Sequence, residues 1–209
     1  PFRRGFFCSD ETIKYPYKED TVSIAVAVAI GFVLALLSVS TTLEDETTLA
    51  FIGRFVWTCG IELGIFMFGG ALCQLGVSIL KLTVGRLRPH FLEVCNPDFS
   101  RINCSGGYIY DYECRLSSTA TAAILREARL SFPSGHSSFL AFSMVYVVLY
   151  LNNKARRQHC GLVKYVLQFA AFATAGYVCI SRVGDYKHHY TDVITGFCIG
   201  VLFAFLTVS

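Results

Sequence analysis

The stretch TVSIAVAVAIGFVLALLSVSTTL, residues 21–43 of the 209-residue chain, contains no charged side chain. About 20 consecutive apolar residues are enough for a helix to cross the hydrocarbon core of a bilayer. The rest of the chain has the same character, because 54% of its residues are hydrophobic and only 16% are charged. Its mean hydropathy is +0.51. This composition excludes an ordinary soluble domain, whose surface requires more charge.

Four further stretches are apolar enough to be considered as spans, and the only acidic residues within them are Glu62 and, at the start of the last stretch, Asp192. We therefore predict an all-α fold, a polytopic membrane helical bundle that forms a single domain over residues 1–209. The expected spans are approximately 21–43, 55–80, 132–151, 165–181 and 191–209.

The short connection 152–164 indicates how the bundle is oriented. It carries four basic residues and no acid, so it should face the cytoplasm. Alternation then places the segment 1–20 and the loop 81–131 on the extracellular or lumenal side. The acidic residues of the connection 44–54 argue against this orientation, but acids contribute little to the rule.

The beginning of the chain leads to a separate expectation. Residues 1–20 are polar and contain no apolar core of a signal peptide. Five spans would also leave the two ends on opposite sides of the membrane. We expect the chain to be a fragment of a longer protein.

Two features of the expected outer side support the orientation. Asn103 begins the glycosylation sequon Asn-Cys-Ser, which is used only on the lumenal side. Four of the nine cysteines also fall on this side, an even number that suits one or two disulfides. These cysteines are Cys8, Cys95, Cys104 and Cys114, and the sequence does not choose among their three pairings.

Three clusters of polar residues lie at the expected outer ends of the spans. They are KLTVGRLRP at 81–89, PSGH at 133–136 and SRVGDYKHHYTD at 181–192. The predicted topology brings all three to the same face of the membrane. Their composition is typical of a site that handles phosphate, in which catalysis depends on positioning and on preorganised positive charge.

Each cluster offers groups suited to phosphate binding. Lys81, Arg88 and Arg182 supply positive charge, and an arginine can hold two phosphate oxygens at once. Ser134 and Gly135 resemble the start of a helix, whose free N–H groups and positive dipole end favour an anion.

Two histidines would perform the chemistry. His188 and Asp192 are four residues apart, so a helix would place them on one face, where the carboxylate could orient the imidazole as a nucleophile. His136, from another helix, would protonate the leaving alcohol and later activate water. His189 lies three residues before Asp192, so spacing alone leaves it as an alternative to His188. Two adjacent histidines point away from each other and no cysteine or acid cluster accompanies them, so we expect no metal and no cofactor.

The motifs K-x6-R-P, PSGH and S-R-x5-H-x3-D occur in the order seen in the lipid phosphate phosphatases, the type 2 phosphatidate phosphatase family. The flanking stretches IKYPYKED, GRLRPHFL, VCNPDFS and DYKHHYTDV resemble its animal plasma-membrane branch, which includes the insect wunen proteins. The resemblance covers nearly the whole chain. It implies six spans in the complete protein. The first of these spans and the C-terminal tail would be missing here.

The resemblance also implies roles for individual residues. His188 would be the nucleophile and form a phosphohistidine, Asp192 would orient it, and His136 would be the general acid. Phosphate would be bound by Lys81, Arg88, Ser134, Gly135 and Arg182. The implied reaction is magnesium-independent hydrolysis of phosphatidate, lysophosphatidate, ceramide 1-phosphate or sphingosine 1-phosphate, with the site facing outward, in the plasma membrane. The expected partners are these lipids and the bilayer, with no nucleic acid.

Other interpretations remain open at this point. The same fold would suit a catalytically inactive scaffold that binds lipid phosphates, or an enzyme acting on a soluble phosphoester or a polyprenyl diphosphate. A transporter would need polar residues at the bilayer midplane, and the spans offer little beyond Gln74 and Gln168. The patterns Gly60-x3-Gly64 and Gly196-x3-Gly200 suit packing of helices within one subunit or in a homo-oligomer. Residues 109–129 should include a short helix over the site.

Overall fold

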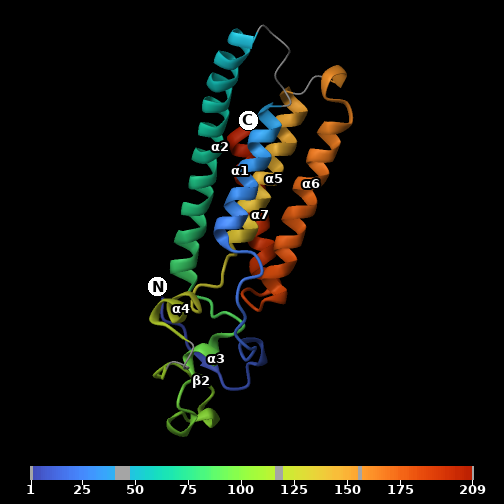
Figure 1. Cartoon of the computed structure of the whole chain (residues 1–209). Helices are drawn as coiled ribbons and strands as arrows, with labels where there is room; N and C mark the ends of the chain where they lie inside the picture. The colour runs from blue at the N-terminus through green and yellow to red at the C-terminus, as the bar shows by residue number, and fades with distance from the viewer. Residues whose placement is uncertain (1, 41–47, 116–119, 155–156, 209) are drawn as a thin grey trace.

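Five long helices form a bundle, and a smaller region covers one end of it (Figure 1). The computed structural model describes residues 2–40, 48–115, 120–154 and 157–208. The long helices are α1 (Ile24–Ser40), α2 (Thr48–Val84), α5 (Gly135–Lys154), α6 (Arg157–Gly184) and α7 (Tyr190–Val208). We name the smaller part the head region; it consists of residues 2–23, 85–115 and 120–134.

Helix α5 is the central element of the bundle and contacts each of the other four long helices. Its aromatic residues Phe139, Phe142 and Tyr146 pack around Phe66 of α2, with ring centroids 5.2 to 6.3 Å apart. The outer surface is also apolar: Trp57 of α2, for example, is 72% exposed. A helix satisfies its own backbone hydrogen bonds, so a surface of this kind is stable against lipid.

The all-α membrane bundle predicted from the sequence is confirmed. Among the described helices, three are long and apolar enough to cross a membrane, namely Val56–Val84, Gly161–Gly184 and Tyr190–Val208. Helix α1 is apolar but has only 17 residues. The number of five spans therefore stays a prediction, while the chain is an integral membrane protein.

Some helix ends differ from the expected boundaries. The connection 152–164 is mostly helical, because α5 continues to Lys154 and α6 begins at Arg157, with a break in helical geometry at Gly161. Residues 155–156 of this connection lie outside the described part. Helix α2 also extends past the expected span at both ends. The physical reason is that an apolar run indicates where lipid contact ends, whereas a helix can continue into water with polar residues.

The head region has small elements and a hydrophobic core of its own. Strand β1 (Phe6–Phe7) pairs with β2 (Tyr108–Ile109) in antiparallel fashion. Its helical segments are η1 (Glu11–Ile13), α3 (Phe91–Cys95), η2 (Phe99–Arg101), η3 (Cys104–Gly106) and α4 (Ala122–Glu127). Helix α4 agrees with the short helix expected within 109–129. The core is built mainly from Phe6, Leu87, Phe91, Val94, Ile109 and Tyr112.

Two disulfides cross-link the head region. The structure pairs Cys8 with Cys104 and Cys95 with Cys114, which is one of the three pairings that the sequence left open. The first bridge connects residues 96 positions apart. It therefore ties the segment before α1 to the connection between α2 and α5.

Small residues allow α5 and α7 to approach closely. A methyl group on Gly196 would lie 2.4 Å from the carbonyl oxygen of Ser134, and one on Gly200 would lie 2.1 Å from that of Ser138. This glycine pair therefore packs within the subunit. The other pair, Gly60 and Gly64, has no atom of the described residues within 4 Å of where a methyl group would be.

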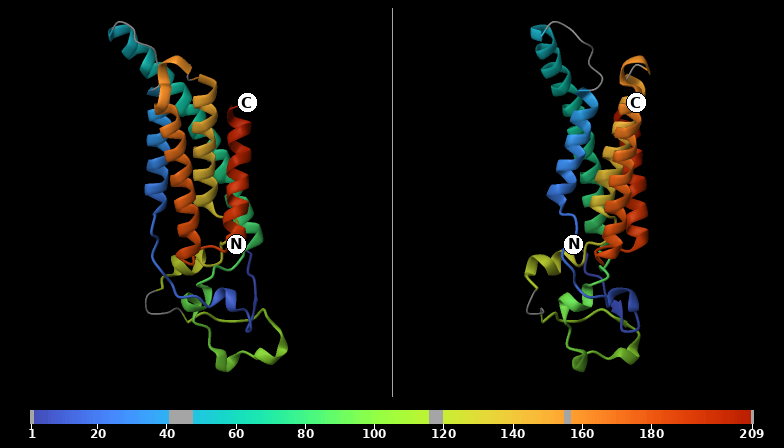
Figure 2. Two further views of the ribbon diagram at one scale, coloured as in Figure 1. Left: turned by 90° about the vertical axis from the view of Figure 1, so that its right-hand side faces the viewer. Right: turned by 45° about the vertical axis from the view of Figure 1, so that its right-hand side comes forward.

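The three polar clusters meet where the bundle joins the head region. The end of α2, the start of α5, the end of α6 and the start of α7 all lie at this junction (Figures 1 and 2). Residues 2–23, the part of the head region that precedes α1, also lead into the bundle at this junction. Glu62, in contrast, lies nearer the opposite end of α2 and accepts a hydrogen bond from the Tyr146 hydroxyl group, so it takes no part in this junction.

Candidate active site

A polar pocket of about 370 Å³ lies at the junction between the bundle and the head region. Six of the residues predicted to form the site line it: Lys81, Arg88, Gly135, His136, Arg182 and His188. Ser134 and Asp192 are fully buried behind this lining. The topology inferred from the sequence thus brings the three clusters together, although they are separated by up to about a hundred residues in the chain.

His188 is held by a backbone acceptor. Its Nδ1 lies 2.7 Å from the carbonyl oxygen of Ser131, which can only accept, so Nδ1 carries the proton. The other ring nitrogen, Nε2, then keeps its lone pair. Burial lowers the pKa of His188 well below its usual value of 6.5, and the positive charges of Arg88 and Lys81 lower it further. The ring is therefore neutral at physiological pH and suited to nucleophilic attack.

Asp192 does not contact His188 in the way that the spacing suggested. Helix α7 begins at Tyr190, so His188 lies before the helix and the two residues do not share a helical face. The carboxylate is 4.0 Å from Nδ1 of His188, too far for a hydrogen bond. It accepts instead from the hydroxyl group of Ser131 at 2.6 Å. Any orientation of His188 by Asp192 passes through Ser131, whose carbonyl group binds the imidazole.

The same carboxylate accepts hydrogen bonds from two further residues, Arg86 and His189. Arg86 Nη1 donates to it at 2.6 Å, and His189 donates through its backbone N–H group at 3.1 Å and through Nδ1 at 3.2 Å. The backbone carbonyl group of Asp192 accepts from the N–H group of Ser134 at 3.0 Å. Asp192 is thus a structural centre that links the start of α7 to the start of α5 and to the loop between α6 and α7 (residues 185–189).

The start of α5 has the helix-capping arrangement predicted for the PSGH cluster. Ser134 precedes the first helical residue, Gly135, and its hydroxyl oxygen accepts from the N–H group of Ser137 at 3.4 Å. A methyl group on Gly135 would lie 3.4 Å from Nζ of Lys81. Glycine therefore keeps the space between the lysine and the helix N-terminus open, where an anion would be stabilised by both.

Two buried polar atoms in the pocket have no hydrogen-bond partner among the described residues, Nε of Arg88 and Nε2 of His136. Unpaired buried polar groups are costly, and those of a native protein call for an explanation. An oxyanion with several acceptor oxygens would satisfy both atoms. The positive charge of Arg88 is balanced in part by Glu127, whose carboxylate is 3.8 Å from Nη2 of the arginine.

The pocket includes residues that the sequence analysis did not assign to the site: Ile24, Gln74, Asp20, Glu127, Leu130 and Lys187. Lys187 belongs to the third cluster and precedes the candidate nucleophile, so its position offered a signal. Asp20 and Glu127 come from the head region, and no spacing rule relates them to the clusters. Ser131 was missed for another reason, because it acts through its backbone carbonyl group.

His189 lies on the other side of Asp192 and lines a separate pocket of about 230 Å³ with Arg4 and Arg86. The geometry therefore favours His188 over His189 as the residue that faces the basic clusters.

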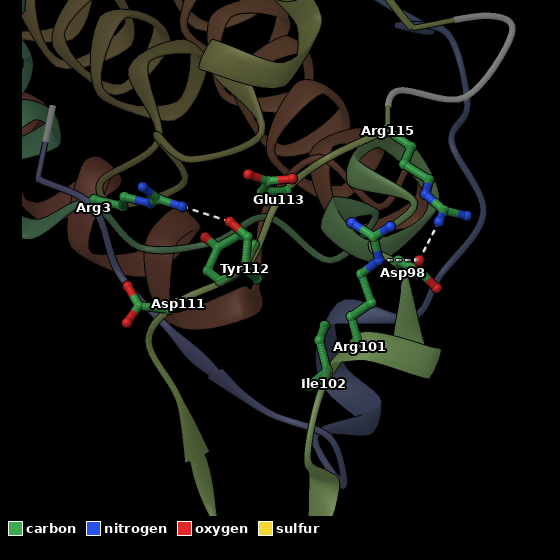
Figure 3. A pocket seen from close by; sticks show the side chains of 8 residues that line it. All are labelled: Arg3, Asp98, Arg101, Ile102, Asp111, Tyr112, Glu113 and Arg115. Carbon is green, nitrogen blue, oxygen red and sulfur yellow. Dashed lines mark hydrogen bonds and ion pairs between the residues drawn. The ribbon is translucent and has the colours of Figure 1, made fainter.

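A larger cavity of about 450 Å³ lies within the head region and is lined by Arg3, Asp98, Arg101, Ile102, Asp111, Tyr112, Glu113 and Arg115 (Figure 3). Arg101 and Arg115 both pair with Asp98, and Arg3 donates to the carbonyl group of Tyr112. Because its three arginines already bind groups of the protein, we assign this cavity no part in catalysis.

We expect His90 to make the folded protein sensitive to acid. Its Nδ1 donates to the carbonyl oxygen of Tyr186 at 2.8 Å, and burial lowers its pKa from 6.5 to about 4. Between these two values the unfolded chain binds a proton that the folded chain excludes, so the free energy of unfolding falls as the pH falls. We expect a loss of about 2 kcal/mol between pH 7 and pH 5 from this residue.

Thermal unfolding of the wild type and of His90→Asn, at pH 7 and pH 5, checks this expectation. Asparagine keeps a donor for Tyr186 but does not titrate. The midpoint of the variant should therefore decrease less on acidification. An equal decrease in both proteins would show that His90 does not contribute to the acid sensitivity.

The fold and the pocket together define an integral membrane protein with a pocket of basic residues and histidines at one end of its helical bundle. The model of the family described as "PAP2 superfamily" matches residues 62–209. The chain belongs to this superfamily.

Relatives from several animals are similar to the chain over nearly its full length. Phospholipid phosphatase 1 of Mus musculus is 43% identical over 213 residues, which cover 99% of this chain and 74% of the relative. Phospholipid phosphatase 2 of Homo sapiens is 39% identical over 217 residues, which cover 100% of this chain and 73% of the relative. A putative phosphatidate phosphatase of Drosophila melanogaster is 36% identical over 234 residues, which cover 100% of this chain and 61% of the relative.

One solved structure is similar to the chain, that of a transmembrane PAP2 type phosphatidylglycerolphosphate phosphatase from Bacillus subtilis. The comparison has a TM-score of 0.48 and 20% sequence identity, and it covers 88% of this chain and 68% of the Bacillus subtilis chain.

Proposed function

We propose that the chain is a magnesium-independent lipid phosphate phosphatase that acts through a phosphohistidine. Its substrates would be phosphomonoesters of the class of phosphatidate, lysophosphatidate, ceramide 1-phosphate and sphingosine 1-phosphate. Membership of the superfamily and the similarity to phospholipid phosphatases make it a lipid phosphatase. The observation that carries the mechanism is the neutral His188, fixed through Nδ1 and placed in a pocket with Lys81, Arg88 and Arg182.

The first step is transfer of the phosphoryl group to the enzyme. The lone pair of His188 Nε2 attacks phosphorus, the bond between phosphorus and the ester oxygen breaks, and His136, which takes up a proton beside the bound phosphate anion, gives that proton to the departing alcohol. Lys81, Arg88 and Arg182 would hold the three equatorial oxygens, on which the transition-state charge is spread. The N–H groups at the start of α5 would add to this stabilisation.

The second step releases phosphate. His136 is neutral after the first step and accepts a proton from water, whose oxygen attacks phosphorus. The P–N bond then breaks, inorganic phosphate leaves, His188 is neutral again and His136 is again protonated. Asp192 would support both steps indirectly, because it fixes Ser131 and so the position of the imidazole.

A lipid substrate agrees with the surroundings of the pocket. An apolar groove of about 270 Å³ between α1 and α2 is lined by Val28, Phe32, Phe66 and Met67, among others. It shares Ile24 and Gln74 with the polar pocket. A phosphate bound in the pocket would thus have an apolar path next to it for the rest of the molecule.

The head region supports an active site on the extracellular or lumenal side, with the plasma membrane as the proposed location. Its two disulfides suit an oxidising compartment. Asn103 is exposed at the start of η3, where its side chain accepts from the N–H group of Ser105 at 3.0 Å. Glycosylation at this position would be compatible with the fold.

Removal of divalent metal tests the proposal directly. The purified full-length protein in detergent is expected to release inorganic phosphate from phosphatidate at an undiminished rate after treatment with EDTA, because the positive charge at the site comes from side chains. The measurement is the initial rate of phosphate release with EDTA and with added Mg²⁺. Loss of activity in EDTA that Mg²⁺ restores would contradict metal independence, and inactivity under both conditions in a folded protein would favour a lipid-binding scaffold.

A further inference from the structure

The guanidinium group of Arg182 is engaged by two carboxylates of the protein. Its Nη1 donates to Asp20 at 2.8 Å and its Nη2 donates to Asp185 at 2.9 Å. Arg182 is also only 1% exposed. In the function proposed above this arginine holds the substrate phosphate. One of its two anionic partners therefore has to make way, at least in part, for the phosphate oxygens.

The two carboxylates differ in how firmly they are held. Asp185 accepts from the backbone N–H group of Thr21 at 2.9 Å and from its hydroxyl group at 2.6 Å, and its side chain is 10% exposed. Asp20 lines the pocket and its side chain is 42% exposed. Asp185 is thus a fixed partner on the protein side of Arg182, whereas Asp20 lies on the side from which a substrate approaches.

The segment that carries Asp20 is anchored across the loop between α6 and α7. The ring of Tyr15 stacks on that of Tyr186 with centroids 4.5 Å apart, and Nζ of Lys187 lies 4.0 Å from the centre of the Tyr17 ring. The same ammonium group is 4.0 Å from the Asp20 carboxylate. These contacts keep one negative charge next to the two cations of the third cluster, while the Asp20 side chain itself stays partly exposed in the pocket.

We propose that Asp20 is an exchangeable counter-ion for the phosphate group: its carboxylate neutralises Arg182 and Lys187 before substrate binds, and the phosphate displaces it. The inference rests on the proposed function. A phosphate carries nearly two negative charges and three acceptor oxygens, so it binds the cations more strongly than a single carboxylate does. The competition weakens binding of substrate and of inorganic phosphate alike. It therefore promotes release of the product, because the carboxylate returns to Arg182 as phosphate leaves.

The variant Asp20→Asn removes the competing charge and keeps the size of the side chain. We expect the inhibition constant of inorganic phosphate to fall about tenfold, since one charge-assisted contact no longer competes. The KM for phosphatidate should fall in the same direction, and product inhibition should become stronger.

Two control variants make this test specific. Glu19→Gln changes the net charge equally at an exposed neighbour that does not line the pocket, and it should leave the inhibition constant unchanged. Asp185→Asn removes the fixed partner of Arg182 and should weaken phosphate binding. The two aspartates of one arginine are therefore expected to act in opposite directions.

Isothermal titration of inorganic phosphate into each purified protein adds a measurement that does not depend on turnover. Tighter binding by Asp20→Asn supports the counter-ion role even if phosphatidate is not hydrolysed, an outcome that would refute only the proposed function. Weaker binding would show that Asp20 holds Arg182 in place, and an equal effect of Glu19→Gln would indicate general surface charge. Either of these results, or no detectable phosphate binding by any of the proteins, would overturn the inference.

Discussion

Replacement of His188 by alanine is expected to reduce phosphate release from phosphatidate by about 10⁴-fold or more, because it removes the proposed nucleophile. The loss should appear in kcat, since the cations that bind the phosphate remain. The initial rate of phosphate release in detergent, with substrate above its KM, measures it. Circular dichroism and thermal unfolding establish that the variant is folded.

A labelled substrate separates the role of His188 from that of its neighbours. With radiolabelled phosphatidate, the wild type should yield protein-bound phosphate that is stable to base and labile to acid, as expected for a phosphohistidine, whereas His188→Ala should yield none. His189→Ala is the matched control, since His189 lines a different pocket, and it should retain the label. The opposite result for the two histidines would reassign the nucleophile.

The general acid can be examined with the same label. His136→Ala should still become labelled from p-nitrophenyl phosphate, whose leaving group departs without a proton, and should then release its phosphate slowly. If this variant turned over p-nitrophenyl phosphate at the wild-type rate, His136 would have no role in the second step.

Substitution of Gly200 by valine is expected to have the largest effect on stability. Its first side-chain carbon would lie 2.1 Å from the carbonyl oxygen of Ser138 and 2.8 Å from the backbone nitrogen of Phe142. These neighbours are backbone atoms of α5, so the two helices would have to separate. We expect a loss of about 3 kcal/mol or more in the free energy of unfolding, at the upper end of the range for overpacked cores.

Gly176→Val in α6 is the matched control, because a methyl group there would meet none of the described residues within 4 Å. Thermal unfolding in one detergent compares the two variants with the wild type. Activity should fall together with stability in Gly200→Val, since α5 begins directly after Ser134 and α7 carries Asp192. Equal midpoints for the two variants would show that the close approach of α5 and α7 is not required for stability.

The meeting of the basic clusters at one end of the bundle could be predicted from the sequence, because it depends only on the lengths and the order of the apolar runs. Apolar runs of sufficient length alternate across the membrane, so Lys81, His136 and Arg182 had to reach the same end of the bundle. The fold class followed from the same runs. The roles of these residues in the reaction stay predictions until the variants are measured.

Other details of the site could not be predicted, for identifiable reasons. The spacing of His188 and Asp192 indicates adjacency only if both residues are helical, and α7 begins after His188. The acceptor for His188 is a backbone carbonyl group, which every residue possesses. Asp20 reaches the pocket through the path of the polypeptide in the head region, which depends on tertiary packing and on a disulfide pairing that spacing does not determine.

The position of His188 in a loop has a consequence for protein engineering. Its backbone N–H group donates to the carbonyl oxygen of Arg182 at 3.2 Å, and its ring is held by Ser131, from a segment 57 residues earlier. Transplanting the third cluster alone into another helical scaffold would therefore transfer the histidine without the geometry that orients it. A functional graft would have to include the segment around Ser131 and the start of α5.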